Sequence, residues 1–263
     1  MNRRTAMAGG LAAPALAAMP AAAQGGGKTF VLLHGAWHGG WCWRDVADGL
    51  RAQGHRVLVP TQTGLGERKH LMSRDITLDT FVTDVVNVLE AEELQDVILV
   101  GHSFGGSGIS GAADRVPERI RHLVYLDALM LEGGQSPFGM LPPDVVEARR
   151  RLVHEQGEGT FIPAPPPSAF GIAESHPGTG WVRRRLTPHP VGTYESQLTL
   201  RNPVGNGRPR TYIHCTNPNY AALEASRQWV RRQQGWNWME IATGHDAMVT
   251  AAPELTRMLA AIG

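Results

Sequence analysis

The sequence predicts an α/β fold: a mainly parallel sheet with helices on both faces and an inserted helical, Pro-rich cap. Two observations predict the sheet. Short apolar runs typical of strands alternate along the chain with amphipathic, helix-like segments. The run Val97–Val100 contains no polar residue, as expected for a strand buried on both faces. A third observation, a proline- and glycine-rich stretch from about residue 129 to residue 207, predicts the cap.

Four apolar runs in the first half of the chain predict strands: Thr29–Leu33, His55–Val59, the run that begins at Val97, and Arg119–Asp127. Apolar residues at helical spacing predict two helices, Arg44–Gln53 and Leu78 to about Leu94. Glycines and a charged cluster indicate a loop over Thr61–Ser73. Strands that alternate with helices in this way pair in parallel, so their carboxyl ends share one edge of the sheet.

The cap segment breaks this alternation. Its prolines fit neither a helix interior nor a central strand, so we expect helices together with an extended Pro-rich segment. A disordered linker is the alternative, but Phe138 and Trp181 offer apolar surface that a folded cap can bury. Beyond the cap, strands are predicted at Pro209–Thr216 and Trp238–Thr243, each followed by a helix, the last over Pro253–Ile262.

The length and charge of the chain favour a single domain. The chain has 263 residues, 42% of them hydrophobic, which is enough for one α/β domain over residues 28–263. A net charge of +1 indicates neither a nucleic-acid partner nor an anionic membrane surface. No later segment has the apolar length of a membrane span. The partner we expect is a small-molecule substrate, and a homodimer is left open.

The N-terminus has the three zones of a bacterial signal peptide. Arg3 and Arg4 precede an uncharged, Ala-rich stretch that ends near Met19, and Ala21–Ala23 matches a small-residue cleavage site. We therefore expect residues 1–23 to be a signal peptide similar to twin-arginine export signals, and the protein to be periplasmic or secreted. A disordered Ala-rich tail is the alternative.

Two cysteines, Cys42 and Cys215, are present in the chain. An oxidising compartment permits a disulfide between them, but we favour two free thiols. Neither cysteine lies in a CxxC pattern or in the spacing of metal ligands, so we expect no metal.

The run Gly101-His102-Ser103-Phe104-Gly105 has the Gly-x-Ser-x-Gly pattern of a sharp turn between a strand and a helix. Such a turn exposes the serine hydroxyl and leaves the backbone N–H of Phe104 at a helix N-terminus, where it can stabilise an oxyanion. Ser103 is therefore the candidate nucleophile.

A serine nucleophile needs a base and a carboxylate that orients the base. His245 follows the last predicted strand and is the candidate base. The segment after Cys215 contains no carboxylate at its start, so Asp127, at the end of an earlier strand, is the candidate acid. Asp246 is the alternative, although its place directly after His245 makes a bond to the imidazole awkward.

The loop after the first strand supplies the rest of the candidate site. The N–H of Ala36 is expected to be the second oxyanion donor, beside that of Phe104. His34, His38 and His102 are expected to brace these loops. We also place four residues at the substrate: Trp37, His38, Phe138 and Trp181.

Three blocks resemble the α/β-hydrolases, in particular the plant methylesterases, salicylate-binding esterases and hydroxynitrile lyases with their bacterial esterase relatives. The blocks are Leu33–Trp41, Gly101–Gly106 and Gly244–Met248. The resemblance implies a Ser-His-Asp hydrolase without cofactor, with Ser103 and His245 as catalytic residues.

Two departures from the family pattern affect the expected chemistry. The usual aspartate position is occupied by Asn217-Pro218, which supports Asp127 as the acid. Where the lyases have a threonine and a lysine, this chain has Gly35 and Asp246, so cyanide elimination is disfavoured. We expect a carboxylesterase for small esters that works through an acyl-enzyme. The alternatives are carbamate or amide hydrolysis, lyase chemistry on the same fold, and a non-catalytic ligand-binding module.

Overall fold

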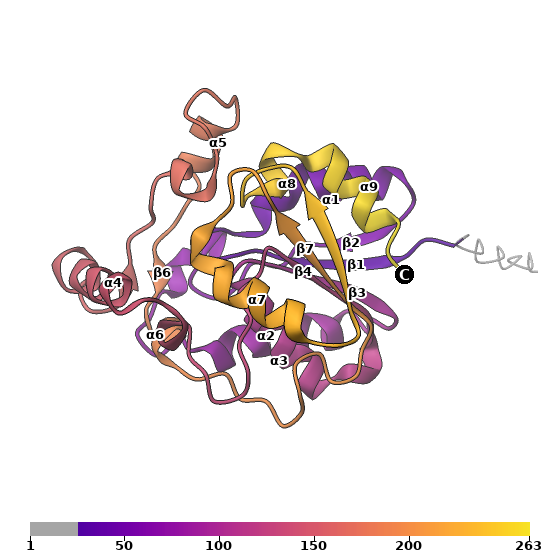
Figure 1. Cartoon of the computed structure of the whole chain (residues 1–263), viewed down its shortest axis with the longest axis horizontal. Helices are drawn as coiled ribbons and strands as arrows, with labels where there is room; N and C mark the ends of the chain where they lie inside the picture. Colours follow the sequence, from indigo (N-terminus) through magenta and orange to yellow (C-terminus); the bar gives the residue numbers. More distant parts are fainter. Residues whose placement is uncertain (1–25) are drawn as a thin grey trace, which may run out of the picture.

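Six parallel strands form the centre of the protein (Figure 1). The computed structural model describes residues 26–263. The strand order across the sheet is β2-β1-β3-β4-β7-β8. The strands are β1 (Thr29–Leu33), β2 (Arg56–Leu58), β3 (Val97–His102), β4 (Ile120–Leu126), β7 (Arg210–Cys215) and β8 (Trp236–Ile241).

Helices cover both faces of this sheet, because successive residues of each strand point to opposite sides. In β1, Phe30 and Leu32 pack into one apolar cluster, whereas Val31 and Leu33 pack into another. The helices of the first cluster are α1 (Arg44–Ala52), α8 (Ala247–Thr250) and α9 (Ala252–Ala260). Those of the second are α2 (Leu78–Ala91), α3 (Gly105–Arg115) and α7 (Glu224–Arg232). The predicted parallel sheet with helices on both faces is confirmed.

The segment between β4 and β7 lies to one side of the sheet, at the left of Figure 1. Its elements are α4 (Pro143–Gln156), β5 (Phe161–Ile162), α5 (Thr179–Arg183), β6 (His189–Pro190) and α6 (Gly192–Glu195). A third apolar cluster joins Phe138, Val153 and Tyr194 of this segment to Trp37 and Phe104 of the sheet edge. The segment is therefore packed as a cap over the carboxyl ends of the strands. The antiparallel pairing of β5 with β6 was not expected from the sequence.

Several element boundaries differ from the sequence predictions. β2 is shorter than the predicted strand, and β8 begins at Trp236, two residues before the predicted start. Part of the predicted loop after β2 is a 3-10 helix, Gly66–Leu71. The remaining 3-10 helices are Gly40–Trp43, Pro117–Arg119, Phe138–Met140, Pro167–Phe170 and Ala221–Leu223. Their short length hides them from a periodicity argument.

The expected signal peptide, residues 1–23, lies outside the described residues. Cys42 and Cys215 are free and buried. Within residues 26–263, no helix has the length and apolar character needed to cross a membrane, and no cluster of three His, Cys, Asp or Glu side chains could hold a metal ion.

The turn from β3 into α3 brings backbones too close together for side chains. A Cβ added at Gly106 would lie 2.7 Å from the carbonyl oxygen of Leu129 and 2.9 Å from the Cβ of Ala128. A Cβ at Gly105 would lie 2.8 Å from the carbonyl oxygen of His34. These contacts join the start of α3 to the ends of β1 and β4.

We expect Gly106→Ala to lower the free energy of unfolding by about 1–3 kcal/mol, because the added methyl must displace backbone rather than a flexible side chain. Gly180→Ala in α5 is the matched control, since its Cβ would meet only the movable end of Arg184, at 3.3 Å. Urea unfolding of both variants measures the difference. Equal stability of the two variants would contradict the close approach at the turn.

Candidate active site

Ser103 lies at the turn between β3 and α3, with a backbone φ of 53°. This left-handed conformation is rare for a residue with a side chain, and its cost is of order 1–3 kcal/mol. The Ser103 N–H donates to the carbonyl oxygen of Leu126 (3.1 Å), and the Leu129 N–H donates to the Ser103 carbonyl (2.9 Å). The end of β4 therefore holds the strained turn in place.

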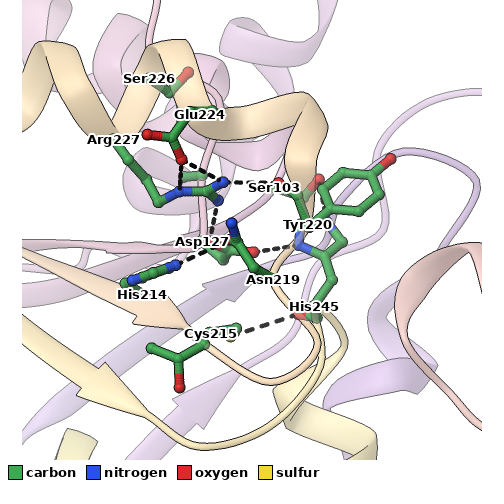
Figure 2. A network of polar contacts seen from close by, with 12 residues as sticks. Ser103, Asp127, His214, Cys215, Asn219, Tyr220, Glu224, Ser226, Arg227 and His245 are labelled. Carbon is green, nitrogen blue, oxygen red and sulfur yellow. Dashed lines mark hydrogen bonds and ion pairs between the residues drawn. The ribbon is translucent and has the colours of Figure 1, made fainter.

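Two hydrogen bonds join Ser103, His245 and Asp127 in a line (Figure 2). Nε2 of His245 lies 2.8 Å from Oγ of Ser103, and Nδ1 of His245 lies 2.7 Å from Oδ2 of Asp127. His245 comes from the loop after β8, and Asp127 directly follows β4. His245 and Asp127 are buried, whereas Ser103 is partly exposed. A hydroxyl, an imidazole and a carboxylate in this order can move a proton away from the hydroxyl.

Asp246, the alternative carboxylate, bonds to a different histidine. Its Oδ2 lies 3.1 Å from Nε2 of His38, and Nδ1 of His38 lies 2.8 Å from the carbonyl oxygen of Ala36. Burial lowers the pKa of the His38 imidazole, but the charge and hydrogen bond of Asp246 outweigh burial and raise that pKa above its usual value. Protonated His38 donates at both ring nitrogens. The pair thus ties the loop after β8 to the loop after β1.

Arg227 of α7 contacts the other oxygen of Asp127, and sequence reasoning missed it. The guanidinium is 3% exposed, and its Nη1 lies 3.3 Å from Oδ1 of Asp127. Its Nη2 donates to the carbonyl oxygen of Tyr220 (2.9 Å) and pairs with Glu224 (3.1 Å), as Figure 2 shows. The available signal was its place in the helix predicted after the strand Pro209–Thr216, three residues before buried Val230 and so on the same face. An arginine on a buried face indicates a buried acidic partner.

The ring of Tyr220 stacks on the imidazole of His245. The two ring centroids are 4.2 Å apart, and the ring planes differ by 20°. Burial raises the pKa of the Tyr220 hydroxyl to about 12, so the phenol is neutral near pH 7. The stack restricts rotation of the imidazole about its hydrogen-bonded axis.

Ala36 and Phe104, the predicted oxyanion donors, both line the pocket that contains Ser103. In the described part of the chain, neither backbone N–H donates to another backbone group. His34 steadies the first of these loops, because its Nδ1–H donates to the carbonyl oxygen of Gly35 (2.8 Å). Its Nε2 accepts from the N–H of Gln62 (3.1 Å). Burial lowers the pKa of His34 to about 3, so the imidazole is neutral, as one donor and one acceptor require.

The pocket beside Ser103 is largely apolar, and the cap contributes much of its lining. Its walls include Trp37, Leu129, Leu141, Tyr194, Tyr220 and Leu223. Among the four residues that the sequence placed at the substrate, Trp37 lies in this wall.

The other three residues lie elsewhere, which corrects the sequence prediction. His38 is buried and uses both ring nitrogens on Ala36 and Asp246. Phe138 packs against Tyr194, with 5.2 Å between ring centroids, and is not part of the lining. Trp181 borders a different hollow, where its ring lies 5.0 Å from that of Trp41. Apolar cap residues pack against each other as well as against a ligand, and the sequence does not separate the two uses.

Comparison with known proteins gives consistent matches. A family model described as "Alpha/beta hydrolase family" matches residues 30–257. A carbendazim hydrolyzing esterase from Nocardioides sp. (strain SG-4G) is 42% identical over 242 residues, which cover 89% of this chain and 99% of the relative. The putative chloroplastic methylesterase 14 of Arabidopsis thaliana is 32% identical over 171 residues, 65% of this chain and 46% of the relative. Both matches support the resemblance predicted from the three sequence blocks.

One solved structure is similar over nearly the whole described chain. It is an extracellular alpha/beta-hydrolase from a Paenibacillus species, described as sharing structural and functional homology with tobacco salicylic acid binding protein 2. Its TM-score is 0.77 at 25% sequence identity, and the match covers 90% of this chain and 99% of that chain.

We expect the free energy of unfolding to fall as the pH drops below about 6.5, where histidines of an unfolded chain take up protons. Burial lowers the pKa of His34 to about 3 and holds the pKa values of His102 and His189 well below their usual range. These three side chains stay neutral in the folded protein. As the pH falls, the unfolded state therefore binds more protons than the folded state and becomes more stable relative to it. Each can remove about 1.4 kcal/mol per pH unit. Urea unfolding between about pH 7.5 and about pH 5 measures the slope.

His189→Gln is the informative variant for this slope. His189 accepts from the Trp37 N–H (3.3 Å) and bonds Thr193 Oγ1 (2.9 Å), and a glutamine can replace both bonds without a titrating group. In His189→Gln, the slope of the free energy of unfolding against pH should decrease by about 1.4 kcal/mol per pH unit, which corresponds to one proton. Unchanged stability of the native chain across this pH range would contradict the neutral, buried histidines.

Proposed function

The chain belongs to the alpha/beta hydrolase family, and on that premise we propose that it is a serine carboxylesterase that cleaves small esters through an acyl-enzyme on Ser103. The hydrogen-bonded line from Ser103 through His245 to Asp127 is the observation that carries the proposal. The esterase and methylesterase names of the relatives agree with this class of hydrolase.

In the proposed first half-reaction, Nε2 of His245 takes the proton of the Ser103 hydroxyl as Oγ attacks the ester carbonyl. The carbonyl oxygen becomes an oxyanion, and the N–H groups of Ala36 and Phe104 donate to it. The imidazolium then passes its proton to the leaving alcohol, the carbon–oxygen bond breaks, and the acyl group remains on Ser103. Asp127 accepts the Nδ1–H of His245 throughout and stabilises the imidazolium.

In the second half-reaction, His245 deprotonates a water molecule that attacks the acyl-enzyme. The same two N–H groups receive the oxyanion, the proton returns to Ser103, and the carboxylic acid leaves. The stack of Tyr220 on His245 and the pair of Arg227 with Asp127 support this cycle, because they hold the base and its carboxylate while the proton moves.

Lyase chemistry is disfavoured at this site. A Cβ at Gly35 would lie 2.8 Å from the Cβ of Ser103, which leaves no room for the threonine that the lyases have there. At the lyase lysine position stands Asp246, which is buried and paired with His38. The residue at the lyase lysine position is therefore a paired anion, and it supplies no positive charge to assist departure of cyanide.

We expect Ser103→Ala to lose ester turnover by on the order of 10⁶-fold, because the acyl-enzyme can no longer form. Ser107→Ala is the matched control, since Ser107 is a buried serine one turn further along α3 whose Oγ has no partner in the described residues. Turnover is measured on p-nitrophenyl, methyl aryl and carbamate substrates, with carbendazim included because the 42% identical relative is named for it. Substantial turnover by Ser103→Ala would overturn the proposal. Failure of an organophosphonate to label Ser103 would instead favour a ligand-binding module.

We expect Asp127→Asn to lower kcat by roughly 10³- to 10⁴-fold, because the amide no longer stabilises the imidazolium or its reactive tautomer. Asp246→Asn should cost about tenfold or less, since it acts only through His38 and the Ala36 loop. Steady-state kinetics compare the two variants, and circular dichroism checks that both fold. A larger loss in Asp246→Asn than in Asp127→Asn would show that the assignment of Asp127 as the catalytic carboxylate is wrong.

A further inference from the structure

Arg149 is the single charged residue among those that line the pocket beside Ser103 in the described part of the chain. It belongs to α4 of the cap and is half-buried. The rest of the wall is uncharged and includes Trp37 and Tyr194. A positive charge therefore faces the same pocket as the proposed nucleophile.

No carboxylate within residues 26–263 forms an ion pair with Arg149. On the same helix, Arg151 pairs with Glu147 at 3.4 Å. The two buried carboxylates of the site, Asp127 and Asp246, are already paired with other cations. A half-buried guanidinium in an apolar wall has lost part of its hydration, and an anion in the pocket would compensate for that loss.

Two aromatic rings hold the Arg149 guanidinium in place. Its central carbon lies 5.0 Å from the ring centroid of Tyr194 and 5.6 Å from that of Trp37. The Arg149 side chain also hydrogen-bonds the Tyr194 hydroxyl, and because a guanidinium has five N–H donors, N–H edges remain for other partners. Those edges match the two oxygens of a carboxylate.

We propose that Arg149 binds a carboxylate of the substrate, so that preferred substrates are esters that carry a second, acidic group. This inference rests on the proposed function, which places the ester carbonyl at Ser103. The apolar side chains that line the same pocket suit an aromatic or aliphatic spacer. Arg149 acts in recognition and takes no part in the proton transfers.

Matched esters test the proposal. Monomethyl terephthalate carries a free carboxylate, methyl 4-methylbenzoate carries a methyl group in its place, and methyl 4-carbamoylbenzoate carries a neutral polar group. We expect the native chain to prefer the acidic ester in kcat/KM. Arg149→Ala should reduce kcat/KM for the acidic ester by roughly ten- to a hundredfold and change it little for the two neutral esters.

Arg151→Ala is the matched control, because it removes the same charge from an exposed position of the same helix. It should leave the preference for the acidic ester intact. Equal losses for acidic and neutral esters in Arg149→Ala, or the same loss in Arg151→Ala, would overturn the inference.

A binding measurement separates this inference from the proposed catalytic function. Calorimetry compares the binding of monomethyl terephthalate to Ser103→Ala and to the double variant Ser103→Ala with Arg149→Ala. If binding depends on Arg149, the anion site stands even where no ester is cleaved. If neutral esters are cleaved and neither assay shows a preference that depends on Arg149, the proposed function stands and the anion site is wrong.

Discussion

The hydrogen bond between His245 and Asp127 determines how the loops at the carboxyl edge of the sheet are arranged. It joins the loops that follow β8 and β4, and β7 lies between these two strands. The His245 loop must therefore pass over the end of β7. The small Cys215 stands at that end, with its Sγ 3.8 Å from the carbonyl oxygen of His245. His102 supports the same loop from β3, because its ring nitrogen Nε2 bonds that carbonyl at 3.0 Å.

The buried charges of the site are divided between two separate pairs. A carboxylate removed from water needs a cation or several hydrogen bonds, and Asp127 and Asp246 have different cations. Arg227 contacts one oxygen of Asp127 and His245 contacts the other. The ion pair of Asp127 with Arg227 therefore orients the proposed base. His38 takes the charge of Asp246 and holds the carbonyl of Ala36, so the second pair orients the loop of a proposed oxyanion donor. Two adjacent residues, His245 and Asp246, thus belong to different pairs, one at the proposed base and one at the loop of Ala36.

Local pattern was enough to predict the sheet, the turn at Ser103 and the residues that lie in line with it. Apolar runs locate strands, and parallel strands bring their following residues to one edge, which is how Ser103, Asp127 and His245 could be grouped. The partners of these residues could not be found in the same way. Arg227 reaches Asp127 from a helix a hundred residues later, and Trp181 of the cap packs against Trp41 in the 3-10 helix after β1. Such contacts depend on tertiary structure that single-sequence periodicity does not contain.

The position of Asp127 at the end of β4 separates the site into a rigid part and a part that can leave it. β3 and β4 are neighbours in the sheet, and His102 pairs with Leu126 at their ends. Backbone hydrogen bonds from this pairing fix Ser103 relative to Asp127. His245 is carried by the loop between β8 and α8. This loop bonds the cap through the Asp246 N–H and the carbonyl oxygen of Phe170 (3.2 Å), and it is not part of the pairing between strands. Partial opening of the protein should therefore remove the histidine first, while the hydroxyl and the carboxylate stay together until the central strands separate.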